Sequence, residues 1–458
     1  MHRVAAVASL LILLAPAIWN RFPLLQYDTG GYLARWYEGD LVPSRSPVFG
    51  LFLNVLTWPE FWPAVVIEAA LTVWVLTLVL RCLKFGERPL LLVGITAALA
   101  LLTTLPWLTS ILLTDIFAGL AVLAAHLLIF ADSELRRWER SALILLVAFS
   151  AATHNATLAI VLALLGAAAL AWRLFGVGSA AGILRGLIAT VFAAALVVGS
   201  NYIVARELAW TPGGLALSFG RMLQDGIVDR YLGDHCPDRH LRLCTYRSVL
   251  PSTADEFFWS GEGSLFDYLG GFDGLGAEMD EIVVGSLREY PLLQMQTAFV
   301  AGVRQLFRIA TGAGVVNTIW HTYWAIDTFA PSAHHGMWAA RQQQHDGVDF
   351  AAINRIDVPV GYASMLVLLV ILVLGWRNPA YADLGLLAAS TTTVLLANAF
   401  VCGVLSNPHD RYGARLIWLG SLVAALLACR ACLKWRAERR LLREAAAMGL
   451  TVETVPPA

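Results

Sequence analysis

The chain has 458 residues, of which 58% are hydrophobic and only 14% are charged, and its formal net charge at pH 7 is −1. The mean hydropathy is +0.66, and this apolar share exceeds that of an ordinary soluble domain. Composition therefore excludes a typical soluble protein and indicates a polytopic membrane protein. The near-zero net charge gives no general attraction to nucleic acid, and the sequence contains no glycine-rich phosphate loop or nucleic-acid motif.

Apolar stretches of the length needed to cross a membrane, about 20 residues, recur along the chain. We predict ten spans, at residues 4–20, 60–81, 89–106, 111–131, 141–153, 156–173, 180–201, 358–376, 380–404 and 413–430. The predicted fold class is all-α and polytopic, with a seven-helix region (1–201), a mixed insert (202–357), a three-helix region (358–430) and a basic tail (431–458). The first span also has features of a secretory signal, but its removal would leave the following loop on the same side.

Lys and Arg in short loops mark the cytoplasmic side. They occur in alternate connections, such as RCLKFGER at 81–88 and DSELRRWER at 132–140, and in the tail. We therefore expect an inner (plasma) membrane protein with both termini in the cytoplasm, and with residues 21–59 and 202–357 facing outward. The outward segment 407–415, NPHDRYGAR, opposes this rule with two arginines, so we expect those arginines to have a function.

The insert contains two cysteines, Cys236 and Cys244, in HCPDRHLRLC. An outward segment lies in an oxidising compartment, so we predict a disulfide between them, the alternative being two free thiols. Residues 291–312 read as an amphipathic helix in the interface plane, and the alternative is a further span. No pair of cysteines has zinc-site spacing with histidines.

Ionisable side chains in or beside lipid are costly and are candidates for a functional site. On the outward side, or within helices near it, these candidates are Asp28, Arg35, Arg45, Glu68, Asp115, His154, His409, Asp410, Arg411 and Arg415. If the helices form a bundle, these groups could converge on one outward-facing cavity.

Each candidate also has a plain structural interpretation. Asp28 could cap a helix that starts near D-T-G-G, and Asp115 could cap the fourth span. His154 could be a hydrogen-bonded turn residue, and Arg411 and Arg415 could extend to lipid phosphates.

Several sequence pieces resemble the GT-C superfamily of polyprenyl-phosphate-sugar glycosyltransferases. The matching pieces are YDTGGYL at 27–33, SRSPVFGLFL at 44–53, the helix at 113–130 that opens with an acidic residue, and RYGARLIWLGSLVAA at 411–425. The chain lacks the paired Asp-Glu of many protein mannosyltransferases and the W-W-D-x-G-type sequence of oligosaccharyltransferases, so the resemblance indicates no subfamily.

The resemblance implies transfer of a sugar from a polyprenyl phosphate carrier to an envelope glycan, lipid or protein, with inversion. It implies that Asp28, with Asp115, supplies the catalytic carboxylates, and we expect partial burial to raise the pKa of Asp28 toward a useful value. The leaving phosphate needs cations, for which Arg411, Arg415, Arg45 and His409 are the candidates. Tyr27, Tyr32, Arg35, His154 and Glu68 would line the substrate cavity. No cofactor is required; the outer carboxylates leave a divalent metal possible, but none of them has the spacing that would fix one.

Two other classes of function remain open. A transporter or flippase for a lipid-linked sugar could use the same charges, although transporters tend to place them near the bilayer midplane. A non-catalytic envelope assembly protein would depend on the insert around Cys236 and Cys244 and would tolerate replacement of Asp28 by Asn.

Overall fold

The structure is a computed structural model that describes residues 1–86, 88–237, 241–261, 263–344 and 347–447. Within these ranges the regular structure is helical, and an isolated bridge between Leu24 and Ile111 is the single β-type pairing. The predicted all-α fold class is confirmed for the described part of the chain. Residues 448–458 of the predicted basic tail lie outside the described residues.

A helix forms at each of the ten predicted spans. They are α1 (His2–Leu13) with α2 (Ala15–Asn20), α5 (Trp62–Cys82), α6 (Pro89–Leu102), α8 (Asp115–Phe130), α9 (Arg137–Thr153), α10 (Asn155–Phe175), α11 (Ala180–Ala205), α20 (Phe350–Arg377), α21 (Ala382–Val404) and α22 (Asp410–Ala447). In the described residues, six helices are long and apolar enough to cross a membrane: α5, α10, α11, α20, α21 and α22. The protein is thus a membrane protein by helix length and composition, and crossing by the shorter helices stays a prediction.

Helix α8 lies at the centre of the bundle. It contacts α5, α9, α10, α11, α21 and α22, and its residues from Asp115 to Ile129 are buried. A helix covered on all sides is expected to be apolar all round, as this one is. Close packing of α8 against α22 requires glycine at position 119, because a Cβ there would lie 2.5 Å from Cζ2 of the fully buried Trp418.

Shorter helices lie in the connections. They are α3 (Tyr27–Glu38), α4 (Pro47–Val55), α7 (Leu105–Leu108), η1 (Asp132–Glu134), η2 (Arg242–Val249), η3 (Pro331–Ala333), η4 (Arg341–Gln343) and η5 (Pro379–Tyr381). Local sequence explains where α4 begins, because the Ser46 hydroxyl accepts the Val48 N–H at 3.2 Å and Pro47 takes the first helical position. Arg45 therefore stands directly before the cap of α4.

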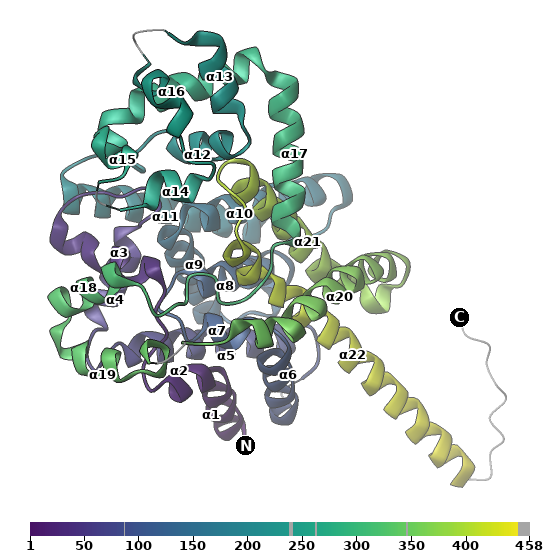
Figure 1. The fold of residues 1–458 in the computed structure, drawn as a ribbon. Helices are drawn as coiled ribbons and strands as arrows, with labels where there is room; N and C mark the ends of the chain where they lie inside the picture. Colours follow the sequence, from purple (N-terminus) through teal and green to yellow (C-terminus); the bar gives the residue numbers. More distant parts are fainter. Residues whose placement is uncertain (87, 238–240, 262, 345–346, 448–458) are drawn as a thin grey trace.

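The first part of the insert has a hydrophobic core of its own. It contains α12 (Ala216–Gln224), α13 (Ile227–His235), α14 (Ala254–Trp259), α15 (Leu265–Tyr268) and α16 (Gly271–Glu289), which gather at the top of Figure 1. Phe219, Phe257 and Ile282 are among its buried residues, in a cluster separate from the core of the bundle.

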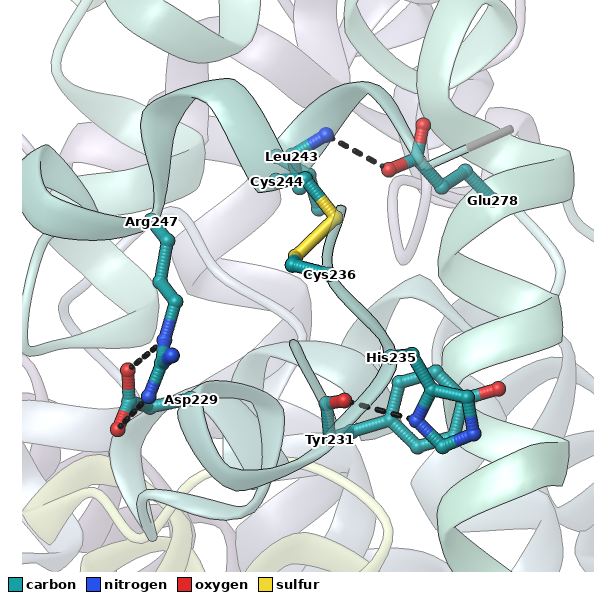
Figure 2. Close-up of a disulfide and its surroundings, with 8 residues drawn as sticks. All are labelled: Asp229, Tyr231, His235, Cys236, Leu243, Cys244, Arg247 and Glu278. Atoms are coloured by element: carbon teal, nitrogen blue, oxygen red, sulfur yellow. Dashed lines mark hydrogen bonds and ion pairs between the residues drawn. A yellow bond between two sulfur atoms is a disulfide. The ribbon is translucent and has the colours of Figure 1, made fainter. Parts of the chain in front are cut away.

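A disulfide closes the connection between α13 and η2 (Figure 2). Cys236 and Cys244 are bonded, as predicted. Beside them, the Arg247 guanidinium donates to Asp229 at 2.8 Å and the Leu243 N–H donates to the Glu278 carboxylate at 2.8 Å. These contacts tie the disulfide-bonded segment to α13 and α16.

The second part of the insert belongs to the membrane bundle. Its helices α18 (Trp320–Phe329) and α19 (His334–Ala339) contribute Tyr323, Ile326 and Met337 to the core of the bundle. Helix α18 packs on α3, where the Gly30 N–H donates to the Thr322 hydroxyl at 3.1 Å. The predicted insert therefore consists of two parts, and the second of them supports α3, in the loop at 21–59 that is predicted to face outward.

Helix α17 (Pro291–Phe307) joins these two parts. Gln294, Ala301 and Gln305 are buried on its inner face, and the helix contacts α21 and α16. The predicted amphipathic helix is present, although it ends at Phe307 and not at residue 312. At the other end of the chain, α22 extends beyond the rest of the molecule toward the lower right of Figure 1.

Candidate functional site

Asp28 lies in the first turn of α3, but it does not cap this helix. The cap is Gln26, whose side-chain oxygen accepts the Asp28 N–H at 2.6 Å, while the Thr29 hydroxyl accepts the Gln26 N–H at 3.1 Å. The Asp28 carboxylate is therefore free for contacts outside its own helix.

Asp28 is held by arginines from two distant parts of the chain. Its Oδ1 lies 2.6 Å from Nη2 of Arg45, and its Oδ2 accepts a hydrogen bond from Nη1 of Arg411. Arg411 also donates from Nε to Oδ2 of Asp115 at 2.8 Å. We call Asp28, Arg45, Asp115 and Arg411 the ion-pair cluster; its charges sum to zero.

The ion-pair cluster stands where helix amino-terminal ends meet. Asp28 and Asp115 lie in the first turns of α3 and α8, and Arg411 is the second residue of α22. The amino-terminal end of a helix carries partial positive charge and favours anions. A cation there is unfavourable on its own. The negative charges of Asp28 and Asp115 offset the unfavourable electrostatic energy of Arg411 at this position.

The electrostatics of Asp28 differ from the sequence-based expectation. Burial alone would raise the pKa of its carboxyl, but Arg45 and Arg411 outweigh burial and hold the pKa below its ordinary value. Asp28 is therefore ionised at neutral pH, and both of its oxygens are engaged. In contrast, Nη2 of the buried Arg411 has no hydrogen-bond partner among the described residues, so one strong buried donor is left unused.

A cavity of about 860 Å³ adjoins the ion-pair cluster. The bundle and the first outer loop supply one side, and α14 with the residues after it supplies another. Its lining is Tyr27, Asp28, Gly31, Tyr32, Arg35, Val42, Ser44, Arg45, His154, Leu217, Asp255, Glu256, Phe258, Trp259, Ser260, Gly261, Ala313, His321, Ser406, Asn407, His409, Arg411 and Tyr412. Its volume lies within the range of small-molecule sites, about 300–1,000 Å³.

His154 both caps a helix and lines this cavity. Its Nδ1 accepts the Ala156 N–H at 3.2 Å, so the proton of the neutral ring is assigned to Nε2. Burial, together with the cations Arg415, Arg411 and Arg45, holds the pKa of His154 well below its ordinary value. The ring is neutral at pH 7 and offers a hydrogen-bond donor rather than a charge.

Four candidates from the sequence lie away from the cavity, namely Glu68, Asp115, Asp410 and Arg415. Asp410 accepts the Ala310 N–H at 3.1 Å. Arg415 is fully buried one turn further along α22, where Nη2 donates to Oδ1 of Asn398 at 2.7 Å. Glu68 is fully buried in α5, and within the described ranges neither of its carboxylate oxygens has a hydrogen-bond partner. Asp115 does not line the cavity, but it holds Arg411.

Two other candidates line the cavity while bound to neighbouring groups. Arg35 donates from Nη1 to Oδ1 of Asp40 at 2.9 Å and also binds Glu38, so it stabilises the end of α3. His409 lies in the connection before α22, with Nε2 at 3.4 Å from Oδ1 of Asp255. Within the described residues, no group of three or more His, Cys, Asp or Glu side chains is placed to hold a metal ion.

Sequence reasoning missed the contribution of the insert. Asp255, Glu256 and Trp259 reach the cavity from α14, and Asn407 from the connection between α21 and α22. The segment DEFFWSG at 255–261 has a sequence pattern that indicates a site, because two carboxylates and a Trp stand beside two phenylalanines. In the structure the Trp is exposed and the phenylalanines are buried. That signal does not say which cavity the segment faces.

Comparison of the chain with protein-family models, curated proteins and solved structures finds no match. The function is therefore argued from the site itself.

Proposed function

We propose that the protein is a membrane glycosyltransferase that takes a sugar from a polyprenyl phosphate carrier and transfers it, with inversion, to an acceptor on the outer side. The observation that carries this proposal is the ion-pair cluster at the cavity, where a carboxylate lies between two arginines and one buried arginine donor has no partner in the part of the chain that the structure describes. A carboxylate base and phosphate-binding cations are the groups that this reaction needs.

The donor phosphate would bind between Arg411 and Arg45. The unpartnered Nη2 of Arg411 offers the first hydrogen bond, and the converging helix ends add positive potential. Arginine suits this role because its planar fork donates two hydrogen bonds to a phosphate and keeps its charge near lipid. The neutral His154 Nε2–H offers a further donor at the cavity wall.

Phosphate binding would also release the base. Asp28 and the phosphate compete for the same guanidinium groups, so an arriving phosphate weakens the hold on the carboxylate. The pKa of Asp28 then rises, because burial remains while the arginines are shared. In the bound state Asp28 becomes a better proton acceptor than it is in the free protein.

The chemical step is then a single displacement at the anomeric carbon. The acceptor hydroxyl oxygen attacks the anomeric carbon, the bond from that carbon to the phosphate oxygen breaks, and the polyprenyl phosphate leaves with the electron pair. The acceptor proton passes to Asp28. Arg411 and Arg45 stabilise the charge that develops on the leaving phosphate, and Asp115 positions Arg411.

This function places the protein in the plasma membrane, with several spans and with both termini in the cytoplasm. The long apolar helices support the membrane assignment, and the alternation of basic loops supports the orientation. The donor would enter from the membrane, and the acceptor would be a component of the cell envelope.

The test is sugar transfer from a mixed pool of polyprenyl-phosphate sugars to envelope extracts by the purified full-length protein. We expect Asp28→Asn to lower the rate about 10²–10⁴-fold and Arg411→Ala about 10²–10³-fold, compared at equal folded amounts. The controls are Asp273→Asn and Arg304→Ala, which change exposed residues outside the cavity. No transfer by the wild type, or full activity of Asp28→Asn, would refute the proposal.

One observation favours transport as the second candidate. Glu68 is a fully buried carboxyl in the membrane-type helix α5, and it has no hydrogen-bond partner among the residues that the structure describes. Ionisable groups within spans are frequent in ion-coupled carriers. A transporter would move a fluorescent lipid-linked sugar across proteoliposome membranes and would lose this activity in Glu68→Gln. The glycosyltransferase would transfer sugar and would keep that activity in Glu68→Gln.

A further inference from the structure

The insert presents one defined segment to the cavity, residues 255–261. Helix α14 is capped by Thr253, whose hydroxyl accepts the Glu256 N–H at 3.2 Å, and is fixed by Phe257 and Phe258, which are buried in the core of the insert. Because this core holds the phenylalanines, the polar residues beside them face the cavity in a fixed arrangement.

Asp255 connects this segment to the loop before α22. Its Oδ1 accepts a hydrogen bond from Nδ2 of Asn407 at 3.2 Å and lies 3.4 Å from Nε2 of His409. The hydrogen bond with His409 holds the pKa of Asp255 below its ordinary value, so this wall carries negative charge at neutral pH. Segment 255–261 is thus attached to the bundle at the cavity.

Two groups on this wall are available to a ligand. The Glu256 carboxylate has no hydrogen-bond or ion-pair partner in the described part of the chain. Trp259 is 46% exposed, and its ring lies 5.5 Å from the guanidinium carbon of Arg45. The guanidinium of Arg45, which is proposed to bind the donor phosphate, therefore has an indole face, a carboxylate and Ser260 nearby.

Charge is distributed unevenly around the cavity. Arg45 and Arg411 lie on the bundle side, and Asp255 and Glu256 lie on the insert side. The bundle side suits a phosphate, whereas the insert side repels acidic ligands and accepts hydrogen bonds from hydroxyl groups. Aromatic side chains provide a large apolar face, on which the C–H face of a sugar ring can pack.

We propose that segment 255–261 is the acceptor subsite, and that the acceptor is a carbohydrate without acidic groups whose ring packs on Trp259 and whose hydroxyls donate to Glu256. This inference rests on the proposed function, because the bound sugar is an acceptor only if the protein transfers a sugar to it. Carbohydrate binding at this wall can nevertheless be measured without transfer. It also assigns acceptor choice to the insert, while donor binding belongs to the bundle.

The experiment titrates the full-length protein in detergent with neutral manno-, arabino- and malto-oligosaccharides, with oligogalacturonates of equal length, and with a pool of short peptides. Binding is followed by saturation-transfer NMR and calorimetry. We expect at least one neutral series to bind, about tenfold weaker binding in Trp259→Ala, nearly unchanged binding in Trp259→Phe, and several-fold weaker binding in Glu256→Gln. The control Trp376→Ala changes an exposed Trp at the far end of α20.

The outcomes separate this inference from the proposed function. Neutral sugars that bind through Trp259 without any measurable transfer would support the subsite and count against the transferase. Transfer that depends on Asp28, with unchanged sugar binding and transfer in Trp259→Ala, would refute the subsite alone. Absence of binding by every neutral series, equal binding of oligogalacturonates, or binding of peptides alone would also refute it.

Discussion

At the scale of single residues, the main feature is a carboxylate that is bound before any substrate is present. Both oxygens of Asp28 are taken by arginines, and its pKa lies below the ordinary value of about 3.9. A carboxylate whose pKa is lowered in this way is a weaker base than an ordinary one. The proposed exchange of Asp28 for phosphate at Arg411 resolves this conflict and can be tested through pH.

The acid limbs of the two kinetic profiles should differ. The profile of kcat/KM reports the free enzyme and that of kcat reports the donor complex, so we expect the acid limb of kcat at a higher pH than the acid limb of kcat/KM. Identical limbs would show that Asp28 keeps both arginines throughout the reaction.

Acid should also destabilise the fold through the same residue. Because the pKa of Asp28 is lowered by folding, its contribution to stability is present above the ordinary pKa of about 3.9 and is lost as pH falls through the lower, folded value. We expect the melting temperature of the wild type to fall more steeply below about pH 4 than that of Asp28→Asn. Parallel melting curves for the two proteins would contradict this.

Arg411 should carry a large share of local stability. Its removal leaves the buried Asp28 with Arg45 alone and takes away the arginine partner of the buried Asp115, and breaking a buried ion pair costs about 3–5 kcal/mol. We expect Arg411→Ala to lower the free energy of unfolding in detergent by that order, against less than about 0.5 kcal/mol for the exposed Arg304→Ala. Partial recovery in the double variant Asp115→Asn, Arg411→Ala would identify the uncompensated charge as the cause.

Part of this site was predictable from individual residues. Asp28, Arg45 and Arg411 stood out because charges beside apolar spans are rare, and the structure brings them together. The choice between Arg411 and Arg415 was not predictable, because both lie on one face of α22 and only packing decides that Arg415 meets Asn398. The direction of the Asp28 pKa shift depends on neighbours 17 and 383 residues away.

At the scale of elements, helix α17 carries an exposed apolar face. Leu292, Met295, Phe299 and Phe307 are exposed along this helix, while its other face packs on α21. At its carboxyl end the Phe307 ring lies 6.0 Å from the ring of Tyr362 of the membrane-type helix α20. The exposed face thus adjoins the surface of a predicted span, and lipid is the expected cover.

This placement predicts lipid contact at α17. In nanodiscs that contain a photoactivatable phospholipid, we expect mass spectrometry to find labelled peptides from residues 291–307. Helix α16, which packs in the core of the insert, provides the comparison and should stay unlabelled. Equal labelling of both, or none on α17, would contradict an interfacial position.

The helical pattern was easier to predict than the grouping of the elements. A continuous apolar run specifies a helix directly, so each predicted span contains one. The division of the insert was not predictable, because the aromatic-rich sequence of α18, WHTYWAIDTF, does not say which core it joins. Its place in the bundle depends on contacts such as that of Thr322 with Gly30. This contact joins residues 292 positions apart.

At the scale of the whole molecule, the proposed orientation can be tested with native cysteines. Cys82 and Cys402 are buried, Cys429 is half-buried, and Cys432 is exposed on the long helix α22. We expect a membrane-impermeant maleimide to label Cys432 only after cells are permeabilised, with Cys432→Ser as the control. Labelling of Cys432 in intact cells would reverse the proposed orientation.

Asp28 and Arg411 are 383 residues apart in the sequence, so the ribosome makes them at different times. Ribosomes add about 5–20 residues per second, so roughly 20–80 s separate the synthesis of these two partners. During this interval Asp28 has Arg45 but lacks Arg411, and Asp115 still lacks the partner that it has in the structure, because α22 does not yet exist. A chain that stops before its final helix would therefore insert most of its apolar segments and still lack a working centre, so membrane insertion alone is no sign of a finished protein.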